Sequence, residues 1–213
     1  MFRHLFKTNK IFRNSTLIIG GLASDIGINN LTDYLYQNSK LYDAKFDKIL
    51  HKLYIKDDIE TFKDNILFNI KIFTELPVSA AIEELLCRDA IMRYLLMTRA
   101  GLGPIISNFM QAVPFSLFHE SIKPNDISDY ANKNLNQDDI KSIADNVNDK
   151  YNNYNYFYYG SLYASGLIFG GLTLLSKTIW IPSVVHTIHN QIWYYNTRKE
   201  YLEKENNDSD SQK

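Results

Sequence analysis

The chain has 213 residues and a formal net charge of −1, from 23 basic and 24 acidic side chains. This balance gives no electrostatic footprint for nucleic-acid binding, and no helix-turn-helix, zinc-finger or RNA-binding motif is present, so we expect no nucleic-acid partner. The single cysteine, Cys87, excludes an intrachain disulfide and a cysteine-rich metal site.

The charged residues are segregated along the chain. Stretches 100–118 and 151–176 contain no Asp, Glu, Lys or Arg, whereas 121–153 and 196–213 are crowded with polar and charged residues. A membrane-spanning helix needs about 20 predominantly apolar residues. The pattern therefore predicts an all-α, polytopic helical membrane bundle, with a soluble bundle of buried helices as the alternative. The last stretch, 196–213, is predicted to be a disordered charged tail.

The N-terminal segment, 1–24, contains Arg3, Lys7, Lys10 and Arg13 but no acidic residue. A cationic, amphipathic start of this kind is typical of a mitochondrial presequence. A basic flank that holds the end of the next hydrophobic segment in the cytosol explains the same residues, and both interpretations stay open.

The next segment, 25–66, mixes apolar and charged residues and is predicted to form amphipathic helices at the membrane surface or on the core. Its apolar residues recur at helical spacing, namely Leu41, Phe46, Ile49, Leu50 and Leu53. No chemistry can be predicted from this segment.

The core of the fold is predicted over 67–195. Hydrophobic helices are expected over 67–98, 101–119, 154–176 and 183–195, with a polar loop outside the membrane at 121–150. Pro77 either kinks the first of these helices or marks its start. Ionisable residues in such helices are costly to bury and usually face the bundle interior, so we expect one polar site between the core helices.

The first polar group is a pair of glutamates followed by an arginine. Glu84 and Arg88 are four residues apart and can pair on one helix face. Glu83 points roughly 100° away around the helix, at about 3.6 residues per turn. A carboxylate left without a local partner in an apolar setting is a candidate general base, although two solvated acids on a surface helix would look the same.

Two histidines complete the set of candidates. Phe115 and His119 share a helix face, and so do His186 and Asn190, one turn apart. A histidine and an amide on one face are good donors to a developing oxyanion, whereas the simpler interpretation is a hydrogen bond that holds helices together. His189 points elsewhere and is expected to be structural.

The order and hydrophobic setting of these groups resemble the CPBP family of intramembrane endopeptidases. That family includes the type II CAAX prenyl proteases and abortive-infection-like proteins linked to bacteriocin processing or immunity. The resemblance covers residues 70–195 and rests on the motifs Glu83-Glu84-x-x-x-Arg88, Phe115-x-x-x-His119 and His186-x-x-x-Asn190. Cys87 stands where the family usually has an aromatic residue, and Asp89 where it has glycine.

The resemblance implies a glutamate-dependent peptidase acting within the membrane. Glu83, aided by His119, would take a proton from a water molecule that attacks a peptide carbonyl, and His186 and Asn190 would stabilise the oxyanion. Glu84, Arg88 and Phe115 would then have supporting roles. Glu83, His119 and His186 also form a ligand set used by catalytic zinc, so a zinc endopeptidase is the alternative. We favour the mechanism without a cofactor, because Asn190 suits an oxyanion donor better than a ligand.

The resemblance also implies partners and a location. Membrane lipids and a membrane-associated or prenylated protein substrate, with CAAX-box processing as one activity, are expected. The mitochondrial inner membrane and the endoplasmic reticulum both stay open. A non-catalytic membrane scaffold or immunity-type protein with the same fold is the second hypothesis, and a small transporter with a proton relay is the third.

Overall fold

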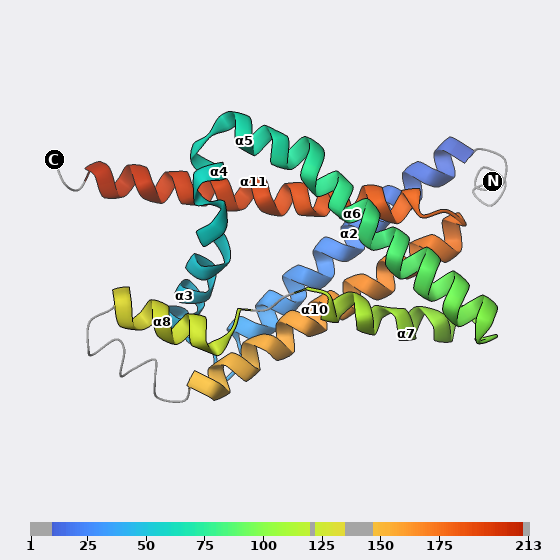
Figure 1. Cartoon of the computed structure of the whole chain (residues 1–213), viewed down its shortest axis with the longest axis horizontal. Coiled ribbons are helices and arrows are strands. Elements are labelled where there is room, and N and C mark those ends of the chain that lie inside the picture. The colour runs from blue at the N-terminus through green and yellow to red at the C-terminus, as the bar shows by residue number, and fades with distance from the viewer. Residues whose placement is uncertain (1–9, 120–121, 135–146, 211–213) are drawn as a thin grey trace.

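The computed structural model describes residues 10–119, 122–134 and 147–210. All regular elements in these ranges are helices (Figure 1), which confirms the all-α prediction. By a hydropathy criterion, none of the helices in the described ranges is both long and apolar enough to span a membrane.

The first described element is helix α2 (Lys10–Gln37), which is continuous despite its internal glycines. Leu17 belongs to the main core cluster, and a Cβ on Gly21 would lie 2.6 Å from Leu172 Cδ1. Glycine at 21 therefore lets α2 approach its neighbours closely. The predicted boundary after residue 24 falls inside this helix. Residues 1–9 of the predicted presequence lie outside the described residues.

A small subassembly lies at one end of the molecule, formed by α3 (Ala44–Ile55) and α8 (Pro124–Asn134) (Figure 1). Ile127 of α8 is fully buried against Phe46 and Leu50 of α3. Helix α8 therefore lies within the predicted loop over 121–150, and its buried Ile127 holds it on α3. Residues 135–146 of that loop lie outside the described residues.

A chain of helical segments then leads to the predicted site. After the 3-10 turn η1 (Lys56–Asp58) come α4 (Ile59–Lys63), α5 (Asn65–Ile70), the π-helical η2 (Lys71–Glu75), α6 (Leu76–Glu84) and the π-helical η3 (Leu85–Arg99). Pro77 lies in the first turn of α6, directly after η2. The backbone is helical on both sides, since Glu75 and Leu76 have α-helical dihedral angles and the Leu76 N–H bonds to the Lys71 carbonyl oxygen, so no separate helix begins at Pro77.

Three further helices complete the core: α7 (Pro104–Leu117), α10 (Val147–Ser176) and α11 (Trp180–Asp210). Lys177, in the left-handed region with φ 62°, separates the last two. Helix α10 packs against α7 and α2, and α11 crosses α2 and α6 (Figure 1).

Helix α11 extends into the predicted tail, as far as Asp210. Arg198 Nε donates a hydrogen bond to the Phe62 carbonyl oxygen at 2.8 Å. The Tyr201 ring also packs at 5.9 Å from the Phe62 ring. These contacts hold the first turns of the expected tail on α4.

The subassembly of α3 and α8 gives a stability prediction centred on Asp43. This carboxylate caps α3 by accepting from the backbone N–H groups of Lys45 and Phe46, at 2.8 and 3.1 Å, and Lys150 Nζ of α10 lies 2.7 Å from Oδ2. Burial raises the pKa of Asp43, but the hydrogen bonds from Lys150 and the two N–H groups outweigh it, so the pKa lies below its ordinary value of 3.8.

We expect Asp43→Ala to lower the free energy of unfolding by about 1–2 kcal/mol, as for the loss of a helix cap. Because the pKa of Asp43 is lower in the folded protein, its carboxylate contributes stability that is fully present above pH 3.8. This stability is lost as the pH falls from 3.8 through the lower pKa of the folded protein. Thermal unfolding followed by circular dichroism should therefore show a large difference from wild type at neutral pH and a smaller one well below pH 3.8. Asp57→Ala, at an exposed acid, is the control, and an equal difference at both pH values would contradict the prediction.

Candidate active site

Glu83 lies near the end of α6 with its two carboxylate oxygens in different surroundings. Ser79 Oγ donates a hydrogen bond to Oε1 at 3.0 Å. Oε2 is shielded from solvent and has no hydrogen-bond partner among the described residues. It lies 3.6 Å from His119 Nε2 and 3.8 Å from His186 Nε2. The structure thus brings these three predicted residues together, from α6, the end of α7 and α11.

The hydrogen bonds of the two Nδ1 atoms determine which ring atoms face Glu83. His119 Nδ1 is 2.9 Å from the Phe115 carbonyl oxygen, and His186 Nδ1 is 3.2 Å from Glu84 Oε1. Both acceptors require an N–H on Nδ1, so in the neutral rings each Nε2 carries a lone pair. Three electron-rich atoms therefore converge on one point, which is a place for a proton, a water molecule or a cation.

Two phenylalanines hold the imidazole rings in this orientation. The Phe115 ring lies 5.0 Å from the His119 ring and 5.8 Å from the His186 ring, and Phe169 of α10 stacks on His186 at 5.0 Å. Aromatic contacts at these distances are favourable and restrict ring rotation. Phe115 thus lies in a supporting position for both histidines.

Beneath the histidines lies a buried ion pair. Glu84 and Arg88 have side chains 0% exposed, and Arg88 Nε donates to Glu84 Oε2 at 2.9 Å. The guanidinium carbon also lies 4.6 Å from the centre of the Phe115 ring. The predicted pairing on one face is present, and His186 lies between the two glutamates.

Two amides in α7 complete this network and were missed from the sequence. Arg88 donates to Gln111 Oε1, and Gln111 Nε2 donates to the Gly166 carbonyl oxygen of α10 at 3.0 Å. Asn108 donates to the Leu167 carbonyl oxygen at 3.0 Å. A Cβ on Gly170 would overlap Asn108. The signal in the sequence that could have identified them is two amide side chains three residues apart in the charge-free stretch 100–118.

Asn190 is the predicted site residue for which the structure shows no polar partner among the described residues. It is half-buried on α11, one turn after His186. Its side chain makes no hydrogen bond with the residues that the structure describes. His189 points away from the site, towards Asp25 of α2, as expected of a structural residue.

The converging atoms of Glu83, His119 and His186 are compatible with a metal ion. One donor atom from each lies within 4.8 Å of the others. A carboxylate and two imidazoles form a ligand set of catalytic zinc, with one position left open. The hydrogen bonds from Nδ1 of both histidines are of the kind that orient metal ligands. The site residues therefore fit zinc.

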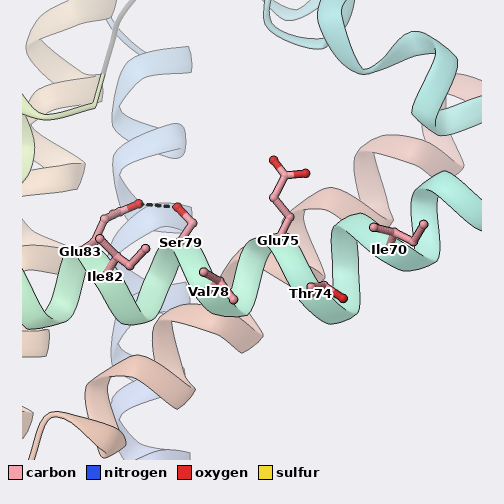
Figure 2. Close-up of a pocket in the computed structure, with 7 residues that line it drawn as sticks. All are labelled: Ile70, Thr74, Glu75, Val78, Ser79, Ile82 and Glu83. Atoms are coloured by element: carbon pink, nitrogen blue, oxygen red, sulfur yellow. Dashed lines mark hydrogen bonds between the residues drawn. The ribbon is translucent and has the colours of Figure 1, made fainter.

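An open groove of about 450 Å³ runs along one face of the rod formed by α5, η2 and α6 and ends at Glu83 (Figure 2). Its lining is mainly apolar, with hydroxyl groups at intervals, and consists of Ile70, Thr74, Glu75, Val78, Ser79, Ile82 and Glu83. The Ser79–Glu83 hydrogen bond lies at the end of the groove opposite Ile70 (Figure 2). An apolar segment lying in this groove would reach Glu83.

Comparison with known proteins identifies a family for the part of the chain that carries the site. A family model described as "type II CAAX prenyl endopeptidase Rce1-like" matches residues 66–192, more than half of the chain. The matched range includes each of the predicted site residues from Glu83 to Asn190. Neither the curated proteins nor the solved structures contain a match to the chain.

The buried ion pair gives a prediction with an internal control on the same helix. Arg88→Met leaves Glu84 charged and buried without its partner, so we expect the free energy of unfolding to fall by about 3–5 kcal/mol. Arg93 forms the equivalent pair with Asp89 at 2.8 Å, but these side chains are 33% and 39% exposed. Arg93→Met should therefore cost less than about 1 kcal/mol. Denaturant unfolding in detergent micelles measures both, and equal losses would contradict the prediction.

Proposed function

The chain belongs to the type II CAAX prenyl endopeptidase Rce1-like family, a family of membrane endopeptidases, and on this premise we propose that Glu83 activates a water molecule for peptide hydrolysis. The observation that carries the proposal is Glu83 Oε2, which is shielded, has no hydrogen-bond partner among the described residues and faces two imidazole nitrogens. A buried carboxylate oxygen left unpaired is costly, and a bound water would satisfy it.

In the proposed reaction, one O–H proton of the water passes to Glu83. The water oxygen forms a bond with the carbonyl carbon of the scissile peptide, and the carbonyl oxygen becomes an oxyanion. The C–N bond then breaks as Glu83 returns the proton to the leaving amine, so that the carboxylate is regenerated. His119 Nε2, 3.6 Å from Glu83 Oε2, accepts a hydrogen bond from the same water and orients it.

His186 and Asn190 are the proposed oxyanion donors. Both lie on α11 one turn apart; Asn190 would donate from its amide, and in this role His186 would need a proton on Nε2 besides the one on Nδ1. The Glu84 carboxylate next to Nδ1 orients this ring. Preorganised donors of this kind stabilise charge that develops in the transition state, and each is worth roughly 10²–10³ in rate.

We also propose that the helices of the core form a membrane-embedded bundle over 67–195. Large apolar side chains are exposed along η2 to η3 and along α7, including Phe73, Ile82, Leu85, Leu95, Ile105, Ile106, Phe109 and Leu117. Extensive exposed apolar surface of this kind is typical of a membrane or protein contact, whereas Glu84 and Arg88 of the same helices are fully buried. The compartment, endoplasmic reticulum or mitochondrial inner membrane, stays a prediction.

The groove supports a membrane-associated polypeptide as the proposed substrate, with prenylated CAAX proteins as the specific case. Its apolar lining suits a lipid-modified or apolar chain, and it ends at the proposed base. Thr74 and Ser79 provide hydroxyl groups along the groove (Figure 2), and these suit hydrogen bonds with an extended backbone. A substrate lying there would present its peptide bond to the activated water.

A zinc-dependent version uses the same residues. Glu83, His119 and His186 would hold the ion, which would polarise the carbonyl and lower the pKa of its bound water. Glu84 would then orient His186 from Nδ1, and the Phe115 carbonyl oxygen would orient His119. We favour the metal-free version because Asn190 lies one turn from His186 as an amide donor.

The base assignment predicts that Glu83→Gln lowers kcat by about 10²–10⁴, since an amide cannot accept the proton, while the protein stays folded. Glu75→Gln is the matched control, because Glu75 lines the same groove but is 61% exposed and pairs with Lys71. Cleavage of a fluorogenic prenylated CAAX peptide in proteoliposomes measures both. Retained activity in Glu83→Gln would refute the role. An inactive wild type whose stability depends on Glu83 would favour the scaffold hypothesis.

The metal-free version predicts that removing divalent cations leaves cleavage unchanged. Purified protein is treated with 1,10-phenanthroline and dialysed, its zinc content is determined by mass spectrometry, and kcat is compared before and after. Loss of activity that zinc restores, with zinc binding reduced in His119→Ala, would establish the zinc version instead.

A further inference from the structure

A second buried carboxylate lies outside the proposed site and is contacted by two of the helices that build it. Asp25 of α2 is 0% exposed. Its Oδ2 lies 2.7 Å from His189 Nδ1 of α11, and its Oδ1 accepts a hydrogen bond from Ser165 Oγ of α10. A carboxylate is costly to bury unless it is paired, so these contacts tie α2 to both helices.

The contact with His189 is a close approach of a carboxylate oxygen to a ring nitrogen. The two atoms are 2.7 Å apart, and neither has an aligned hydrogen bond among the described residues. A carboxylate and an imidazole this close in a buried setting attract each other most strongly when the ring carries both protons. Rotation of α11 would separate the two groups and leave the buried carboxylate with one contact fewer.

Each partner of Asp25 is connected to the site by a short path. His189 follows His186 by three residues on α11, so the helix backbone transmits its orientation to His186. Ser165 precedes Gly166, whose carbonyl oxygen accepts from Gln111. Gln111 in turn binds Arg88, which pairs with Glu84 next to His186. The two paths thus meet at the imidazole that faces Glu83.

We propose that Asp25 is a positioning residue that fixes the rotation of α11 against α10 and thereby keeps His186 Nε2 on Glu83 Oε2. The inference rests on the proposed function of the Glu83, His119 and His186 site. It assigns Asp25 no contact with substrate or water.

The chain offers a matched control one turn further along α2. Asn29 accepts a hydrogen bond from Ser161 Oγ of α10, as Asp25 does from Ser165. No hydrogen bond of the Asn29 side chain with α11 is present in the described part of the chain. Asn29→Leu therefore removes a similar polar link between α2 and α10 without releasing α11.

The test compares Asp25→Leu, Asp25→Asn and Asn29→Leu in the full-length protein. For Asp25→Leu we expect kcat on the prenylated CAAX peptide to fall about 100-fold, as for a misplaced catalytic group, with little change in KM. Asp25→Asn keeps an acceptor for Ser165 and offers an N–H to His189 Nδ1, so it should recover most of the loss. Asn29→Leu should stay close to wild type.

A second readout does not depend on activity. The rate of His186 modification by diethylpyrocarbonate is measured by peptide mass spectrometry, with His51 of α3 as the internal reference. The His186 side chain is 5% exposed, and we expect its modification to be several-fold faster in Asp25→Leu but unchanged in Asn29→Leu. This readout separates the positioning role of Asp25 from the proposed peptidase activity. An inactive wild type would refute the peptidase activity, and the modification rates of His186 would still test the role of Asp25.

A folded Asp25→Leu with wild-type kcat and a protected His186 would overturn the positioning role. Equal effects of Asp25→Leu and Asn29→Leu would also overturn it, since they would indicate a general loss of packing. Should Asp25→Leu fail to fold, Ser165→Ala and His189→Gln each remove one of the two contacts and are measured in the same way.

Discussion

The burial of Arg88 is the constraint on which the rest of the structure depends. A guanidinium removed from water must be neutralised and must satisfy its N–H groups. Glu84 neutralises it from the preceding turn, Gln111 accepts from it across the helix interface, and Phe115 covers its face. Gln111 also donates to the backbone of α10. One buried charge therefore holds η3, α7 and α10 in a single arrangement.

This arrangement gives the two adjacent glutamates different roles. Glu84 faces the arginine, and Glu83, the preceding residue, faces a different direction around the helix and approaches the two histidines. His186 contacts both carboxylates, with Nδ1 on Glu84 and Nε2 on Glu83. The buried pair thus orients the imidazole that faces the proposed base. The His186 side chain therefore contacts both the structural ion pair and the proposed base.

The departures from the family pattern leave this geometry intact. Cys87, in place of an aromatic residue, is buried in the main core cluster with Phe115 and Phe169. Asp89, in place of glycine, lies on the outer face of η3 and pairs with Arg93. Neither side chain contacts the three atoms that converge at Glu83, so the substitutions alter the packing around the site rather than its chemistry.

The sequence by itself determined the helical class, the family and the pairing of Glu84 with Arg88, because these depend on local spacing and on motifs within single helices. It also identified Glu83, His119 and His186 as candidates. Only the tertiary structure brought these three together and showed that Gln111 and Asp25 are buried and hydrogen-bonded to neighbouring helices. It also placed helices within the predicted tail and polar loop, where Arg198 and Ile127 make contacts with distant segments. Such contacts join residues far apart in the chain, and no local pattern of apolar and polar residues encodes them.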